Sequence, residues 1–200
     1  MDMGQFIDEN KAAIREALEG IDKHALPHNI TIRIFKETAS LFNQSSSDAI
    51  PGYITWAPLN NNLRELVATI QGPPDTPYSE GIFHLRVKLP DDYPMVTPQV
   101  WFWTKIYHPN IESTGAICLN ILGSDWNPAQ HIESILISVC ALLGSPNPDD
   151  PVRPEIAVQL MHDKPLFDRT AREWTDRYAA GELIFPGTRA DGFCNATSSG

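Results

Sequence analysis

The sequence predicts an α+β fold, with an antiparallel sheet followed along the chain by helices. Four short strand-like runs lie between segments rich in glycine, proline and asparagine, and patterns with helical period come after them. With 200 residues, of which 42% are hydrophobic and 20% charged, the chain has the composition of a soluble globular protein and the length of one domain with extensions.

Residues 4 to 23 have the pattern of an amphipathic helix. Its apolar face would be formed by Ile7, Ile14, Leu18 and Ile21. A docking helix and a tail with helical tendency explain this pattern equally well, because one short apolar stripe seldom holds a helix without a partner. Pro27 closes the segment, so we treat residues 1–27 as an N-terminal extension.

Residues 28 to 44 carry two periodicities at once. Ile30, Ile32 and Ile34 alternate as in a strand, whereas Ile30, Ile34 and Leu41 would share one face of a helix. The residues alone leave both alternatives open. Residues 45–52 are rich in serine and contain proline and glycine, which predicts a loop.

Four strand-like runs come next. They are Tyr53 to Ala57, Leu63 to Gln71, Ile82 to Leu89 and Gln99 to Thr104. Turn-forming residues separate them, and an antiparallel meander is the simplest assembly. In the third run a buried set, Phe83, Leu85, Val87 and Leu89, alternates with a polar set, His84, Arg86 and Lys88. This alternation predicts that His84 is a surface residue.

A helix is predicted to follow Asn127, which can cap it, with Pro128 at its first position and Gly144 at its end. Its apolar stripe consists of Ile132, Ile135, Leu136, Val139, Leu142 and Leu143. Cys140 lies beside this stripe and is predicted to pack in the core.

The proline-rich residues 145–154 predict an irregular connection. Two further helices fit Pro154 to His162 and Pro165 to Ala180. The last residues, 181–200, form a C-terminal tail in this interpretation.

Charge and cysteine usage exclude several classes of protein. The net charge of −10 and the absence of any basic run argue against a nucleic-acid partner. Cys118, Cys140 and Cys194 cannot all pair and show no metal-ligand spacing, which predicts a reducing compartment, the cytoplasm or nucleus, and no metal site. The sequence shows no signal peptide and no apolar run of membrane-spanning length, so no membrane association is expected.

The segment from Tyr107 to Ala129 places Cys118 in a loop-rich stretch. Asn110 stands eight residues before it, a separation of about 26 Å in an extended chain. Ser113, Thr114 and Gly115 favour a reversal that would bring the two together. A free cysteine between apolar neighbours is also explained by core packing, so the residues alone leave that alternative open.

Three short segments resemble the active-site region of ubiquitin-conjugating enzymes: His108-Pro109-Asn110, the stretch from Gly115 to Leu119, and Trp126-Asn-Pro128-Ala129. The resemblance extends from Arg33 to about Tyr178 and is greatest to the branch that serves RING and HECT ligases. It implies the fold of that family (the UBC fold), a helix at residues 33–37, and a catalytic core domain at residues 28–180.

The resemblance also implies a function. Cys118 would accept ubiquitin from the activating enzyme as a thioester and, with a RING or HECT ligase, pass it to a lysine of a protein substrate. The expected partners are therefore ubiquitin, the activating enzyme, the ligase and the substrate. No cofactor is expected, because ATP is used by the activating enzyme upstream.

Residues 112–125 contain no lysine, arginine or histidine, so Cys118 lacks a local activating group. Such a cysteine suits attack on a thioester better than hydrolysis of an amide, which favours acyl transfer over a thiol protease. A conjugating enzyme for another modifier and a non-catalytic binding module remain alternatives. Cys118 argues against the binding module, because inactive members of the family lack this cysteine.

Two further residues match catalytic positions of the family. Asn110 is either a donor to the thioester oxyanion or an amide that braces the loop from Glu112 to Gly115. Asp150 matches the family's acidic gate residue, which would orient the incoming amine or accept its proton, although aspartate in such a loop is also a common turn residue. His108 and Pro109 are expected to support the loop, His108 through hydrogen bonds.

The resemblance implies contacts with the ligase and the activating enzyme at three places. Arg33 and Lys36 lie on the first helix, Met95 on one loop, and Pro128 and Ala129 on another. Met95 departs from the aromatic residue that is frequent at this position, and its flexible side chain keeps an apolar anchor. Asn120 replaces the aspartate of the nearest relatives and bears on which modifier is used.

Overall fold

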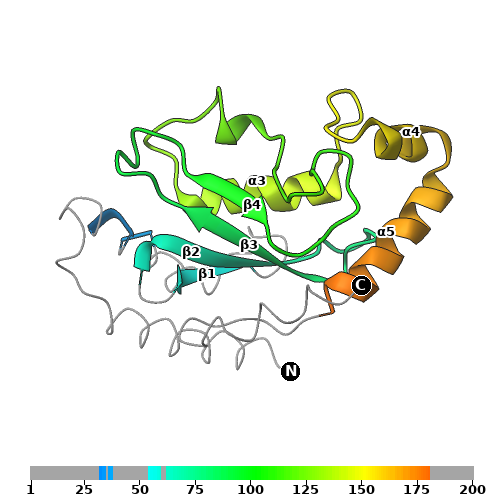
Figure 1. Ribbon diagram of the computed structural model, residues 1–200, viewed down its shortest axis with the longest axis horizontal. Coiled ribbons are helices and arrows are strands. Elements are labelled where there is room, and N and C mark those ends of the chain that lie inside the picture. Colours follow the sequence, from blue (N-terminus) through cyan, green and yellow to red (C-terminus); the bar gives the residue numbers. More distant parts are fainter. Residues whose placement is uncertain (1–31, 35, 38–53, 60–61, 181–200) are drawn as a thin grey trace.

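The computed structural model describes residues 32–34, 36–37, 54–59 and 62–180 (Figure 1). From Ile54 onwards strands come first and helices after them, which confirms the α+β prediction. The elements are β1 (Ile54–Leu59), β2 (Asn62–Gln71), β3 (Ile82–Lys88), β4 (Gln99–Phe102), the short 3-10 helix η1 (Asn120–Leu122), α3 (Ile132–Gly144), α4 (Pro154–His162) and α5 (Lys164–Tyr178).

The strands form an antiparallel meander in the order β1-β2-β3-β4, as predicted. Its register places Ile54 opposite Ile70, and Ile70 opposite Phe83. β1 ends at Leu59, two residues after its predicted end. β4 ends at Phe102, two residues before its own predicted end. Apart from these ends, the period-two pattern located the strands correctly.

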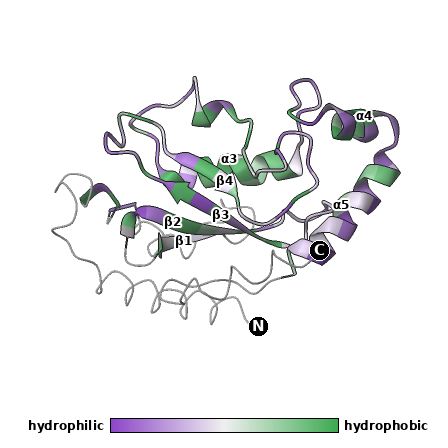
Figure 2. Ribbon diagram, viewed as in Figure 1, coloured by the Kyte–Doolittle hydropathy of each residue, from purple (hydrophilic) through white to green (hydrophobic). Residues whose placement is uncertain are grey.

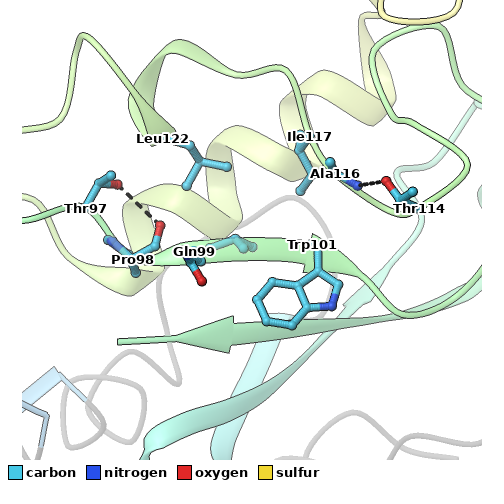
Figure 3. A pocket seen from close by; sticks show the side chains of 9 residues that line it. Thr97, Pro98, Gln99, Trp101, Thr114, Ala116, Ile117 and Leu122 are labelled. Carbon is cyan, nitrogen blue, oxygen red and sulfur yellow. Dashed lines mark hydrogen bonds between the residues drawn. The ribbon is translucent and has the colours of Figure 1, made fainter. Parts of the chain in front are cut away.

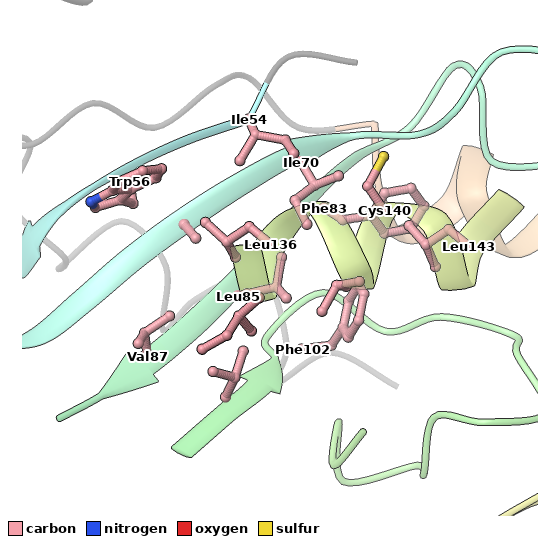
Figure 4. Close-up of a cluster of buried hydrophobic side chains, with 14 of the residues drawn as sticks. Ile54, Trp56, Ile70, Phe83, Leu85, Val87, Phe102, Leu136, Cys140 and Leu143 are labelled. Atoms are coloured by element: carbon pink, nitrogen blue, oxygen red, sulfur yellow. The ribbon is translucent and has the colours of Figure 1, made fainter. Parts of the chain in front are cut away.

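The hydrophobic core lies between the sheet and α3. Leu136, Cys140 and Leu143 project from α3 towards side chains of the strands (Figure 4). Figure 2 shows α3 as largely hydrophobic and α5 as largely hydrophilic, which fits a central and a peripheral helix. Cys140 is 1% exposed, so the prediction that it packs in the core is confirmed.

The start of α3 differs from the prediction. The helix begins at Ile132, four residues after Pro128. The Asn127 side chain does cap a turn, because its Oδ1 accepts the amide of Ala129 at 2.8 Å, and the Gln130 side chain accepts the amide of Asn127 at 3.0 Å. This local pair closes a separate turn, which keeps Pro128 and Ala129 outside the helix.

The prediction that His84 is a surface residue is wrong, since it is only 6% exposed. The chain after β4 turns back onto it: the amides of Trp103 and Thr104 donate to the His84 carbonyl at 2.8 and 3.2 Å. The Thr104 hydroxyl also accepts the His84 amide at 2.9 Å. These contacts end β4 early and cover a position that strand alternation assigned to solvent.

Residues 32–34 and 36–37 are helical, which decides between the two periodicities of this segment in favour of the helix. The predicted helix at 4–23, the loop at 45–52 and the tail at 181–200 lie outside the described residues, and the domain limits stay predictions. Within the described part, no helix has the length and apolar character needed to cross a membrane.

Candidate active site

A short hairpin carries the cysteine. Residues Ile111 and Ile117 pair across it, and its turn is closed by the amide of Gly115, which donates to the Glu112 carbonyl at 2.9 Å. Gly115 has φ +90°, and a Cβ on it would lie 2.1 Å from the carbonyl oxygen of Phe102. Only glycine fits this turn and this close approach to β4. The predicted reversal is confirmed.

The reversal brings Cys118 beside Asn110. The Cys118 amide donates to the Asn110 carbonyl at 3.0 Å. On its other side, the partly exposed Cys118 Sγ lies 3.8 Å from Asp150 Oδ2 and points its thiol at that carboxylate. Residues that are 32 positions apart in sequence therefore meet at the sulfur.

Burial raises the pKa of the Cys118 thiol, and the nearby negative charge of Asp150 raises it further. A thiol whose anion is disfavoured is a poor choice for attack on an amide. Exchange with a thioester is less demanding, because the leaving group is itself a thiolate. The electrostatics at Cys118 therefore favour acyl transfer between thiols.

Asn110 is 1% exposed, and its side chain is fully engaged. Its Nδ2 donates to the carbonyls of Asn147 at 2.7 Å and Asp150 at 3.0 Å, and its Oδ1 accepts the amide of Asn147 at 2.9 Å. The side-chain amide thus braces residues 147–150, and no hydrogen bond of that side chain reaches the loop from Glu112 to Gly115, where the bracing alternative had located it. By holding this loop, Asn110 places Asp150 next to the sulfur.

His108 is buried with both ring nitrogens in hydrogen bonds. Nδ1 accepts the Asn110 amide at 3.1 Å, so Nε2 carries the proton and donates to the Leu142 carbonyl at 3.1 Å. Burial lowers the pKa of His108 to about 4. The ring is neutral and fully used, which leaves it unable to serve as the base of a thiol protease. Next to it, the Pro109 carbonyl accepts the amides of Val152 and Arg153 at 3.0 and 2.9 Å.

The depressed pKa of His108 predicts acid sensitivity. In the unfolded chain the ring binds a proton near pH 6.5 but in the folded chain only near pH 4, so stability present above pH 6.5 is lost as the pH falls through this window. The loss amounts to about 3 kcal/mol. In urea titrations at pH 7, 6, 5 and 4.5, His108→Gln is expected to flatten this slope. The exposed His162→Gln variant should keep it, and an unchanged slope in His108→Gln would refute the assignment.

The residues expected to contact partners lie in different environments. Met95 is 74% exposed, and Lys36, Pro128 and Ala129 are also exposed. Arg33 is different, because its guanidinium donates to the Gln130 carbonyl at 2.6 Å and pairs with Glu37. Its charge is used inside the protein, which sequence reasoning missed.

A groove of about 520 Å³ runs between β4 and the segment that carries Cys118 (Figure 3). Its lining is uncharged: Thr97, Pro98, Gln99, Val100, Trp101, Thr114, Ala116, Ile117 and Leu122. Sequence reasoning did not anticipate it, because it forms only when residues 114–122 pack beside the sheet. Among the residues that the structure describes, no group of three or more His, Cys, Asp or Glu side chains is arranged to hold a metal ion.

Comparison with known proteins agrees with this site. The family model described as "Ubiquitin-conjugating enzyme" matches residues 33–175. The chain is 49% identical to the Saccharomyces cerevisiae protein named ubiquitin-conjugating enzyme E2 13 over 147 residues, which are 74% of this chain and 93% of the yeast protein.

Among solved structures, the E2 domain of a Toxoplasma gondii ubiquitin conjugating enzyme superposes with a TM-score of 0.67 at 39% identity. The match covers 74% of this chain and 97% of the Toxoplasma domain. Since the family model spans well over half of the sequence, the chain belongs to the ubiquitin-conjugating enzymes, which are transferases that form a thioester with the modifier.

Proposed function

We propose that this enzyme accepts ubiquitin from the activating enzyme on the sulfur of Cys118 and transfers it, with a RING or HECT ligase, to a lysine of a protein substrate. The observation that carries the proposal is the juxtaposition of the partly exposed Cys118 Sγ with Asp150, 3.8 Å away, in a site whose loop is held by Asn110. The reducing cytoplasm or nucleus is the proposed location, in keeping with Cys118 and Cys140 being thiols outside any disulfide.

In the charging step, the Cys118 thiolate attacks the thioester carbonyl carried by the activating enzyme. A new carbon–sulfur bond forms, and the sulfur of the activating enzyme leaves as a thiolate. The reaction exchanges one thioester for another, so it needs no strong base and no cofactor in this chain. ATP enters only upstream, where the first thioester is made.

In the transfer step, a lysine amine attacks the carbonyl on Cys118, negative charge builds on the carbonyl oxygen, and Cys118 leaves. The amine must be neutral, and in this proposal the Asp150 carboxylate orients it and accepts its proton; the distance of 3.8 Å between Asp150 Oδ2 and Sγ supports this role. Asn110 reaches the oxyanion by exchanging one of its carbonyl partners, the Asn147 or Asp150 backbone, for the oxygen of the substrate.

Charging with a panel of modifiers tests this proposal. The enzyme is incubated with ATP, ubiquitin and its activating enzyme, and in parallel with other ubiquitin-like modifiers and theirs, and adducts are resolved on gels with and without reductant. We expect an ATP-dependent adduct with ubiquitin that thiol reductant removes. A reducible adduct formed only with another modifier would transfer the proposal to that modifier, the alternative raised by Asn120.

Asp150→Ala is predicted to separate two acceptors. Removal of the carboxylate should slow discharge of the charged enzyme to free lysine about tenfold or more, and by up to the roughly 10²–10⁴-fold that general acid–base catalysis contributes. Discharge to a small thiol should be unchanged, because a thiolate gains nothing from a group that handles an amine proton. The rates are measured from about pH 7 to 9.5, which approaches the pKa of lysine.

The neighbouring, exposed Asp149→Ala variant is the matched control for Asp150→Ala. It should behave as the wild-type enzyme with both acceptors. Rising pH should partly restore lysine discharge in Asp150→Ala, since more amine is then neutral. Equal slowing with lysine and thiol would reduce Asp150 to a structural residue of its loop.

A further inference from the structure

One buried carboxylate joins three segments that are distant in sequence. Glu37 is 3% exposed and lies in the first helix, which is described at residues 32–34 and 36–37. Its Oε1 pairs with the Arg33 guanidinium and accepts the Tyr93 hydroxyl at 2.9 Å. Its Oε2 accepts the amide of Ile132, the first residue of α3, at 2.9 Å. We call this set, Arg33, Glu37, Tyr93 and Ile132, the Glu37 clasp.

Each arm of the clasp stands next to an exposed residue of the proposed partner surface. Lys36 directly precedes Glu37, and Met95 lies two residues after Tyr93. On the third arm, the Arg33 guanidinium also donates to the carbonyl of Gln130, the residue that follows Ala129, at 2.6 Å. The buried carboxylate, directly and through Arg33, therefore helps to fix the relative positions of the three exposed sites.

A second contact, which does not involve Glu37, also holds two of these segments together. The Trp126 indole donates to the Pro94 carbonyl at 2.9 Å, and its ring lies 6.1 Å from the ring of Tyr93. This contact joins the loop of Met95 to the loop of Ala129 but does not reach the first helix. Within the described part of the chain, the side-chain hydrogen bonds of the clasp tie the first helix to both loops.

The chemistry of the clasp requires a carboxylate. The Arg33 Nε and the Ile132 amide can only donate hydrogen bonds, and each donates to a different oxygen of Glu37. A glutamine of the same shape has one accepting oxygen and one donating nitrogen. In either orientation its nitrogen faces a donor, so the glutamine loses either the pair with Arg33, which also holds the Gln130 carbonyl, or the bond to the start of α3. Burial, and next the charge of Glu37, raise the pKa of Tyr93, which keeps its phenol a donor.

We propose that Glu37 is a positioning residue for ligase recognition: it sets the spacing of Lys36, Met95 and Ala129 so that they form one binding surface. Arg33 acts within this clasp, as the charge partner of Glu37. The inference rests on the proposed function, because it takes the ligase as the protein that binds this surface. Glu37 contributes nothing to the chemistry at Cys118.

The test uses an isolated RING domain that stimulates discharge by the wild-type enzyme. Titration calorimetry with uncharged enzyme gives the Kd for this domain, and discharge of the charged enzyme to free lysine without ligase gives the intrinsic rate. Glu37→Gln should raise the Kd at least tenfold and leave intrinsic discharge within twofold of wild type. Tyr93→Phe, which removes one arm but keeps the ring, should give a smaller increase.

A double-mutant cycle distinguishes positioning from general destabilisation. Met95→Ala should weaken binding of the RING domain by removing a direct contact. In a Glu37→Gln background the same substitution should raise the Kd much less, because Met95 is already displaced. Additive losses in Kd, or a Kd unchanged by Glu37→Gln in a folded enzyme, would overturn the inference. Failure of wild-type enzyme to charge with ubiquitin would instead count against the proposed function, since the Kd measurement involves no catalysis.

Discussion

Cys118→Ser is expected to form an adduct with ubiquitin that survives thiol reductant, and to lose turnover of lysine modification altogether. The serine hydroxyl occupies the position of Sγ beside Asp150 and can accept the acyl group. The product is an ester, whose alkoxide is a far poorer leaving group than a thiolate. Charging should therefore be slow and the adduct nearly inert towards lysine. Gels with and without reductant, and multiple-turnover assays with a ligase, measure both effects.

Cys140→Ala is the matched control for Cys118→Ser. Cys140 is 1% exposed and packs between α3 and the sheet, so ubiquitin cannot reach it in the folded enzyme. Its removal should lower stability by about 1 kcal/mol, the scale of a lost core group, and leave the reducible adduct intact. If Cys118→Ser still gave a reducible adduct in wild-type yield, the nucleophile would be another cysteine.

Asn110→Ala is expected to slow discharge to lysine by roughly 10²-fold or more, the scale of one lost oxyanion donor. The rate of charging should stay close to that of the wild-type enzyme, because transfer of the acyl group from one thiol to another depends less on stabilising the oxyanion. The measurement compares single-turnover charging with discharge of the isolated thioester to free lysine. Asn147→Ala is the control, because Asn110 contacts only backbone atoms of Asn147.

The structure also gives Asn110 a bracing role, and the two roles predict different results. If its only task were to hold residues 147–150, the alanine variant would release Asp150 and resemble Asp150→Ala in rate. The double variant would then be no slower than either single variant. An oxyanion role adds a further loss in the double variant, while equal loss of charging, discharge and thermal stability would indicate a collapsed loop.

The features predicted well from the sequence are those encoded by neighbouring residues. The period-two runs located the strands, the apolar stripe from Ile132 to Leu143 located the face of α3, and the turn residues before Gly115 located the hairpin. In each case the residues that form the pattern lie within a short stretch of sequence. The active site was identified from the family resemblance, because the spacing of the residues alone did not distinguish a catalytic Cys118 from a cysteine packed in the core.

The features that were missed depend on contacts between distant segments. Glu37 meets Ile132 across 95 positions, and Asn110 meets Asn147 across 37. Neither pair leaves a periodic trace in the sequence. His84 was misassigned for a related reason: alternation tells which face of a strand a residue occupies, but a later segment covers that face. Arg33 was interpreted as a surface charge, because the carbonyl that accepts its hydrogen bond belongs to Gln130, which is distant in sequence.

Mapping the attachment site of ubiquitin tests the central claim most directly. Wild-type enzyme is charged, quenched in acid to preserve the thioester, cleaved after glutamate under non-reducing conditions and analysed by mass spectrometry. Cleavage after Glu112, Glu133, Glu155 and Glu182 puts Cys118, Cys140 and Cys194 in three different peptides. We predict that the C-terminal residues of ubiquitin are attached to peptide 113–133, which contains Cys118. Attachment to peptide 134–155 or 183–200 would contradict the account.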